Sequence, residues 1–230
     1  MTLQEAIIAR HSVRQYTEKP IEPEKILQLQ NLIEVCNREG VLHIQLVTGE
    51  PKAFSCMIAH YSRFEGVRNY IAMVCKKNDD EHLGYYGEKV VLLAQTLGLN
   101  SCWVGASFRK QPDRYSVLPD EKLVCVVSLG YGANQGVQHP QKRTVADVTE
   151  DRRTTGHGQP YPDWFIRGTE AALLAPTAVN QQRFSFILHD NSRVEARKRL
   201  AIFAAYAPID LGIARCHFEL GAGKDNFEWA

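Results

Sequence analysis

The chain has 230 residues, of which 44% are hydrophobic and 23% are charged, which is typical of a globular protein with a buried core. Its formal net charge is only +1, so the excess of Lys and Arg that a broad nucleic-acid surface requires is missing. The chain does not open with a charged segment followed by an apolar run, and no apolar stretch is long enough for a bilayer span. We therefore expect a cytoplasmic protein.

The first part of the chain alternates predicted helices and strands. Thr2 and Glu5 have the spacing of a capping box, and the short amphipathic helix that follows should end near Arg10. A second helix is predicted after Pro23 and ends at Gly40. Further along, strands are predicted at 41–47, 69–77 and 122–132, helices at 53–64 and 86–100, and a tight small-residue segment at 101–107. This alternation indicates an α+β or α/β domain.

The second part repeats the first in outline. Residues 135–162 are rich in Gly, Pro, Thr and charge, which favours a connector, and a helix at 163–177 and a strand at 183–190 follow. The order of elements suggests a duplicated half-domain that packs like a two-fold dimer within one chain, although two helix–turn–strand units can also resemble each other by chance. The expected halves are residues 1–145 and 146–230.

The six cysteines form no C-x-x-C pair, and most lie within apolar segments. Free cysteine behaves as a small hydrophobe, so we expect buried reduced thiols. A zinc site would need clustered Cys and His, which the sequence lacks, so no metal is expected.

A cluster of polar residues follows the first predicted helix. Arg10, His11, Ser12 and Arg14 place two arginines, a histidine and a serine within five residues. Such a cluster is either a solvated helix end or a pocket for an anion such as a phosphate. The cluster alone does not decide between them.

Four stretches resemble motifs of the FMN-dependent nitroreductase family. "RHSVRQY" (10–16) matches R-[RH]-S-x-[RK]-x-[FY], and "APTAVNQQRF" (175–184) matches A-P-[ST]-x-x-N-x-Q-P-[WF] except at Arg183. "GLNSCWVG" (98–105) resembles G-L-G-x-x-W-[IV]-G except at Asn100, and "QKRTVADV" resembles a basic pair ahead of an xxLxxV stretch. The resemblance implies a nitroreductase-like α+β fold, with a mixed or antiparallel sheet flanked by helices.

The order of these motifs is unusual for the family. Ordinary members are homodimers whose flavins lie at the subunit interface, and the A-P-S-x-x-N motif follows the first motif within the same half. Here that motif occurs only in the second repeat. The resemblance is therefore to single-chain members with two nitroreductase-like halves, of which the first supplies the phosphate motif and the second the partner motif. It implies one FMN per chain and a monomer, with a homodimer as the alternative.

The resemblance also implies which residues hold the FMN phosphate. Arg10 and Arg143 are expected to bind it, with Ser12 donating its hydroxyl and Lys142 adding charge. His11 is expected to hydrogen-bond the ribityl chain or the edge of the phosphate.

A second group of residues is expected around the ring and ribityl chain: Arg14, Val104, Gly105, Pro176, Thr177, Asn180 and Gln182. By family position, Arg14 should approach the N1–C2=O side of the ring, and the backbone at Val104 and Gly105 should approach N5. The amides of Asn180 and Gln182 are expected at the polar edge of the ring or at the ribityl hydroxyls, with Pro176 and Thr177 shaping the pocket wall.

The function implied is an oxidoreductase that carries hydride from NADH or NADPH through FMN to a nitroaromatic, quinone or similar acceptor by a ping-pong mechanism, with no catalytic side chain. One alternative is a flavin-binding protein that stores or senses FMN without efficient turnover. Another is an interaction module that binds no cofactor.

Overall fold

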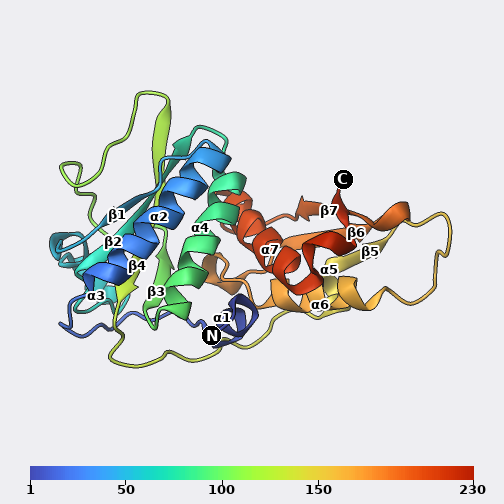
Figure 1. Ribbon diagram of the computed structural model, residues 1–230, viewed down its shortest axis with the longest axis horizontal. Coiled ribbons are helices and arrows are strands. Elements are labelled where there is room, and N and C mark those ends of the chain that lie inside the picture. The colour runs from blue at the N-terminus through green and yellow to red at the C-terminus, as the bar shows by residue number, and fades with distance from the viewer. The chain divides into compact units, whose positions relative to one another are not determined.

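The computed structural model describes residues 1–230, which form two compact units, Met1–His139 (unit 1) and Pro140–Ala230 (unit 2; Figure 1). The expected boundary after residue 145 lies within unit 2, and the duplication itself stays a prediction. None of the helices combines the length and the apolar character needed to cross a membrane.

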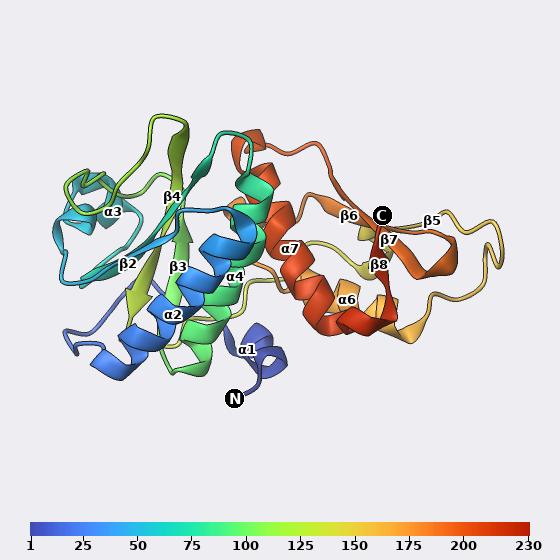
Figure 2. The ribbon, with the colours of Figure 1, turned by 45° about the horizontal axis from the view of Figure 1, so that its top comes forward.

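Unit 1 is built around a four-stranded antiparallel sheet. Its helices are α1 (Leu3–Ala9), α2 (Pro23–Gly40), α3 (Met57–Tyr61) and α4 (Asp80–Thr96), and its strands are β1 (Gln45–Val47), β2 (Asn69–Lys76), β3 (Asn100–Val104) and β4 (Glu121–Gly130). The strand order is β1-β2-β4-β3. Helices α2 and α4 lie side by side over one face of this sheet (Figures 1 and 2).

The sequence explains why β2 is central to unit 1. Its residues from Tyr70 to Cys75 are all buried, as expected for an apolar strand covered on both faces. One face meets the helices, and the other packs on a cluster that includes Phe54, Phe64 and Val104. At the start of the chain, the Thr2 hydroxyl accepts from the Glu5 amide and the Glu5 carboxylate accepts from the Thr2 amide, which confirms the capping box.

Unit 2 contains a four-stranded mixed sheet beside two packed helices. Its helices are α5 (Val145–Val148), α6 (Asp163–Leu173) and α7 (Ala207–Ala222), and its strands are β5 (Thr149–Asp151), β6 (Phe184–Leu188), β7 (Arg193–Lys198) and β8 (Glu228–Trp229). The order is β5-β6-β7-β8, with only the central pair antiparallel. Helices α6 and α7 pack against each other (Figure 2). Gly221 lets α7 approach α6 closely, because a Cβ there would lie 2.6 Å from that of Ala171. Aromatic rings fill the space between the helices and the sheet, and Phe186 stacks on Phe218 at 4.4 Å.

The two sheets flanked by helices confirm the α+β prediction, but several local predictions were wrong. The helix expected at 86–100 spans Asp80–Thr96, and the tight segment expected at 101–107 belongs to β3 as far as Val104. The strand expected at 41–47 begins only at Gln45, because Val41 is left-handed (φ 53°) and the Asn37 amide pairs with both backbone groups of Ile44. The helix expected at 53–64 is broken into the 3-10 turn η1 (Lys52–Phe54) and α3. The connector expected at 135–162 contains α5 and β5.

All six cysteines are free and buried, which confirms the prediction of buried reduced thiols. Burial raises the pKa of Cys36 to about 11 and that of Cys75 to about 12. These two thiols are therefore protonated at neutral pH.

Candidate functional site

The cluster of polar residues lies on an extended segment that is hydrogen-bonded to the sheet of unit 1. Helix α1 ends at Ala9 with Arg10 as its C-cap, and the chain then runs beside β3, where the Val13 amide donates to the Ser101 carbonyl at 3.0 Å. The buried Tyr16 side chain anchors the other end, since its hydroxyl donates to the Val13 carbonyl and pairs with the Ser128 hydroxyl. The apolar positions of "RHSVRQY" thus fix its polar positions in place.

Arg10 is buried, so the solvated helix end is the wrong reading of this residue. Its side chain is 6% exposed, and the guanidinium Nε lies 3.8 Å from Oε1 of Glu88. Neither Nε nor Nη1 has a hydrogen-bond acceptor. Buried donors are normally paired, so these two N–H groups are suited to an anion supplied from outside the chain. A phosphate group fits this donor set.

The other residues of the polar cluster, His11, Ser12 and Arg14, have different environments. Burial, with the nearby charge of Arg10, lowers the pKa of His11, so the imidazole is neutral at pH 7. Ser12 pairs with Ser101 of β3. Arg14 is exposed, and its guanidinium carbon lies 5.9 Å from the centre of the Phe64 ring.

Sequence reasoning missed Glu88, which connects two parts of this region. It lies on α4 with no exposed surface, and its Oε2 accepts from the Trp103 indole at 2.8 Å. The ring fits over α4 because Gly87 lacks a side chain, as a Cβ there would lie 2.9 Å from Cη2 of Trp103. The available signal was an acidic residue on the same helix face as the buried Val91 and Gln95.

Val104 and Gly105 follow Trp103 along the chain, at the end of β3. Alternation along the strand turns Trp103 toward α4 and Val104 into the buried cluster on the other face. Gly105 is half-buried. Val104 ends the strand that neighbours the Arg10–Tyr16 segment, and Gly105 directly follows it.

Asn100 replaces a glycine of the family motif and has a structural role. Its side chain accepts from the Gly132 amide at 2.9 Å and donates to the Gln135 side chain at 3.1 Å. It thereby ties β3 to the loop that follows β4. That loop lies beside the polar cluster, because a Cβ on Gly136 would lie 2.9 Å from that of His11.

In unit 2, hydrogen bonds gather the candidate residues around the turn η2 (Ala178–Asn180). Lys142 donates its backbone amide to the Gln182 side chain and its ammonium to the Val179 carbonyl, each at 3.1 Å. The Asn180 amide donates to the Pro140 carbonyl, and the Thr177 hydroxyl accepts from the Gln182 backbone. The basic pair and the A-P-T motif therefore lie together.

Gln182 is committed to this local structure. It is 2% exposed, and its side-chain nitrogen donates to the Leu173 carbonyl at 2.7 Å while its oxygen accepts from Lys142. Pro176 and Arg143 are both half-buried, and Arg143 directly precedes the capping box of α5. The side chain of Gln182 thus braces the turn.

The η2 turn is strained. Val179, Asn180 and Gln182 all have positive φ, at 47°, 53° and 46°, and a branched residue such as Val179 is rarely found there. Such a residue costs on the order of 1–3 kcal/mol and persists only where its surroundings hold it. Asp210 of α7 supplies part of that hold, since its carboxylate accepts from the Ala178 amide at 3.0 Å and from the Gln181 side chain at 2.9 Å. Burial raises the pKa of Asp210 to about 6.

No group of three or more His, Cys, Asp and Glu side chains is placed to hold a metal ion. Separately, the candidate residues offer cationic and hydrogen-bonding groups, among them Arg10, Ser12 and Lys142.

Comparison with known proteins identifies the relatives of this chain. A family model described as "Putative TM nitroreductase" matches residues 2–222. Among solved structures, a Thermotoga maritima protein with the same nitroreductase description is 21% identical, with a TM-score of 0.63 over 99% of this chain and 87% of that one. This similarity confirms the nitroreductase-like fold. No curated protein sequence matches the chain.

Two further structures are similar over part of the chain. A "putative nitroreductase in complex with FMN" from Desulfovibrio desulfuricans is 16% identical, with a TM-score of 0.48 over 70% of this chain and 99% of that one. An "FMN-dependent Nitroreductase" from Clostridium difficile is 18% identical, with a TM-score of 0.44 over 56% of this chain and 88% of that one.

Proposed function

We propose that this chain, which belongs to the nitroreductase family, transfers hydride from NADH or NADPH to a nitroaromatic, quinone or similar acceptor with FMN as its cofactor. Membership of this family supports the assignment of the chain as a flavin oxidoreductase. When bound, FMN supplies the reversible two-electron chemistry, which alternates between donor and acceptor in a ping-pong cycle. The protein's own residues bind, orient and tune it.

The observation that carries this proposal is the state of Arg10. A buried guanidinium with unpaired donors on Nε and Nη1 is suited to binding an anion, and the FMN 5′-phosphate is a doubly charged anion. Ser12, two residues after Arg10, adds a hydroxyl. A neutral His11 can donate or accept a hydrogen bond at the ribityl chain without repelling the charge of Arg10.

The ring is assigned to the exposed end of the same segment and to the end of β3. The charge of Arg14 would stabilise negative charge at the N1–C2=O side of a bound ring and would thereby raise its potential. The backbone at Val104 and Gly105 contributes the groups that approach N5. Gly105 has no side chain to block that approach.

Unit 2 is assigned the part that a partner subunit plays in ordinary family members. Asn180 supplies an amide to the ring edge or the ribityl hydroxyls, Pro176 and Thr177 form the pocket wall, and Lys142 and Arg143 add charge for the phosphate. Gln182 acts indirectly, because both ends of its amide are used in holding the η2 turn. One chain of two nitroreductase-like halves, 1–145 and 146–230, then carries one FMN and needs no second subunit.

The test is the flavin content of a double variant. R10A/R14A should lose the flavin absorbance bands while keeping its far-UV circular dichroism, and R10K, which keeps the charge but not the fork, should retain FMN only weakly. R109A/R114A is the matched control, because it removes two exposed arginines from unit 1. Full FMN in R10A/R14A would overturn the proposal. Steady NADH or NADPH oxidation with a quinone acceptor separates the enzyme from a flavin-storage protein.

A further inference from the structure

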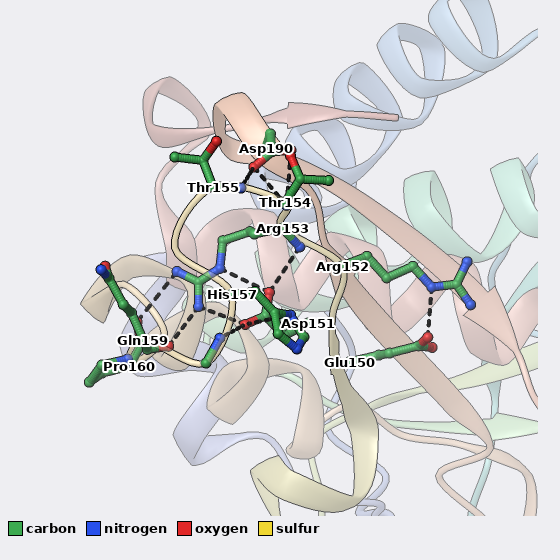
Figure 3. Close-up of polar contacts among 11 residues, drawn as sticks. Glu150, Asp151, Arg152, Arg153, Thr154, Thr155, His157, Gln159, Pro160 and Asp190 are labelled. Atoms are coloured by element: carbon green, nitrogen blue, oxygen red, sulfur yellow. Dashed lines mark hydrogen bonds and ion pairs between the residues drawn. The ribbon is translucent and has the colours of Figure 1, made fainter.

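Unit 2 contains a second stretch of arginines and hydroxyls, Arg152 to Thr155, directly after β5 (Figure 3). Figure 3 shows that its side chains and amides converge on acidic residues of the same unit. Arg152 pairs with Glu150 at 2.7 Å on the exposed surface, where such a pair contributes little. The half-buried contacts of Arg153 and the exposed contacts of Thr154 determine whether this stretch is open to a ligand.

Arg153 is saturated by acceptors from its own loop. Its Nε and Nη2 each lie 2.9 Å from an oxygen of Asp151, which forms a two-pronged ion pair with side chains only 12% and 15% exposed. Nη2 also donates to the Gln159 carbonyl at 2.6 Å. The fork that would receive a phosphate is therefore already filled, in contrast to Arg10.

The neighbouring backbone donors converge on a second carboxylate. The amides of Thr154 and Thr155 donate to Asp190 at 3.1 and 3.0 Å, and the Thr154 hydroxyl donates to the same carboxylate at 2.5 Å (Figure 3). Consecutive amides that point at one anion form a nest of the kind that binds phosphate in many proteins. The Thr154 hydroxyl, and then the two amides, lower the pKa of Asp190, so this internal anion stays charged at neutral pH.

Asp190 lies at the start of a strained turn between β6 and β7. Asn191 and Ser192 both have a φ of 56°, and glycine would be the less costly residue at either position. A cavity of about 270 Å³ adjoins the carboxylate and is lined in part by Arg153, Thr155 and Trp164. A small anion would therefore have room to reach the same donors.

We propose that the Thr154–Thr155 turn is an anion-binding site for a phosphate group, which the carboxylate of Asp190 occupies and closes. The inference goes beyond the flavin assignment and does not depend on it, because every residue involved lies in unit 2. It also accords with the single phosphate-bearing ligand of the proposed function: Arg10 keeps unpaired donors, whereas the donors of the second stretch are taken by Asp151 and Asp190.

The experiment removes the internal anion and supplies inorganic phosphate in its place. The melting temperatures of the wild type and of D190A are measured in phosphate and in chloride at equal ionic strength. D190A should gain roughly 3–6 °C at about ten times the Kd for phosphate, because a ligand that binds only the folded state stabilises it. The Thr154 and Thr155 amide resonances should shift in D190A and not in the wild type.

Two control variants separate an anion site from a general loss of negative charge. D147A removes a carboxylate that accepts from one amide and one hydroxyl of Thr144, and it should gain no phosphate response. D190N keeps one acceptor oxygen in the turn and should respond less than D190A. If D190A is destabilised, phosphate should restore its melting temperature toward that of the wild type. A D190A response to phosphate no larger than that of the wild type, in a stable or a destabilised variant, would overturn the proposal.

Discussion

The guanidinium of Arg10 and the carboxylate of Glu88 form a buried ion pair without a hydrogen bond, at 3.8 Å between Nε and Oε1. Glu88 balances the charge of Arg10 but leaves its donors unpaired, while its other oxygen is fixed by Trp103. Arg10 is thereby held in the core with two nitrogens that have no hydrogen-bond acceptor.

Glu88→Gln should reveal this balance. The variant keeps an acceptor for the Trp103 indole but leaves the Arg10 charge buried alone, which costs up to about 3–5 kcal/mol when a buried pair is broken. Thermal unfolding without ligand should show the loss. Phosphate or FMN should raise the melting temperature of E88Q more than that of the wild type, because the anion replaces the missing charge. E34Q, at an exposed position on α2, is the control, and an equal ligand response in E88Q and the wild type would contradict the account.

Asp210→Asn should change how stability depends on pH. Burial raises the folded-state pKa of Asp210 from 3.8 to about 6, so the folded state prefers the protonated acid. The stability gained from protonation is full below pH 3.8 and is lost as the pH rises through 6, by about 3 kcal/mol in total. Relative to D210N, the wild type should therefore become less stable between pH 4 and pH 7. Urea unfolding of both proteins measures this difference.

The control for this pH dependence is D225N, at an exposed position that follows α7. Its stability difference from the wild type should be the same at pH 4 and at pH 7. A difference between the wild type and D210N with no pH dependence, or with the opposite slope, would show that Asp210 is not the buried acid described here.

Val179→Gly should cost no stability. Val179 is 61% exposed and has φ 47°, so glycine removes left-handed strain of about 1–2 kcal/mol and adds about 0.5–1 kcal/mol of chain entropy cost. The expected net effect lies between no change and a stabilisation of about 1.5 kcal/mol. Val137→Gly, at a 76% exposed valine without positive φ, should instead destabilise the chain. Equal losses in both variants, measured by urea unfolding, would argue against strain at η2.

Asn100→Gly restores the residue of the family motif and should weaken unit 1. It removes the acceptor for the Gly132 amide and the donor to Gln135, at an expected cost of about 1–3 kcal/mol. N100D keeps the acceptor and should lose less. Hydrogen exchange at the Gly132 amide reports the bond directly, and unchanged protection in N100G would sink this role for Asn100.

Features with a local signal were predicted from the sequence. The capping box at Thr2 and Glu5 and the apolar runs of β2 and α4 depend on neighbours within a few residues. Strand β5 has no such signal, because its three residues pair with β6 from beyond α6. Strand β7 carries only Val194 as a buried residue, so it shows no alternation.

The same distinction between local and distant contacts applies to the candidate site. The positions of Arg10, His11 and Ser12 on one segment follow from their adjacency in the sequence. The burial of Arg10 against Glu88 does not, because the partner comes from a distant helix. The use of the Gln182 amide is equally hidden, since its acceptor and donor partners are backbone groups of Leu173 and Lys142.

The central claim is that one chain binds one FMN through Arg10. Its most direct measurement is the amount of FMN released on denaturation of the purified, FMN-saturated protein, together with that released from R10A/R14A. The account predicts one FMN per wild-type chain and almost none from the double variant. Two FMN per wild-type chain, or an undiminished amount from the double variant, would contradict it.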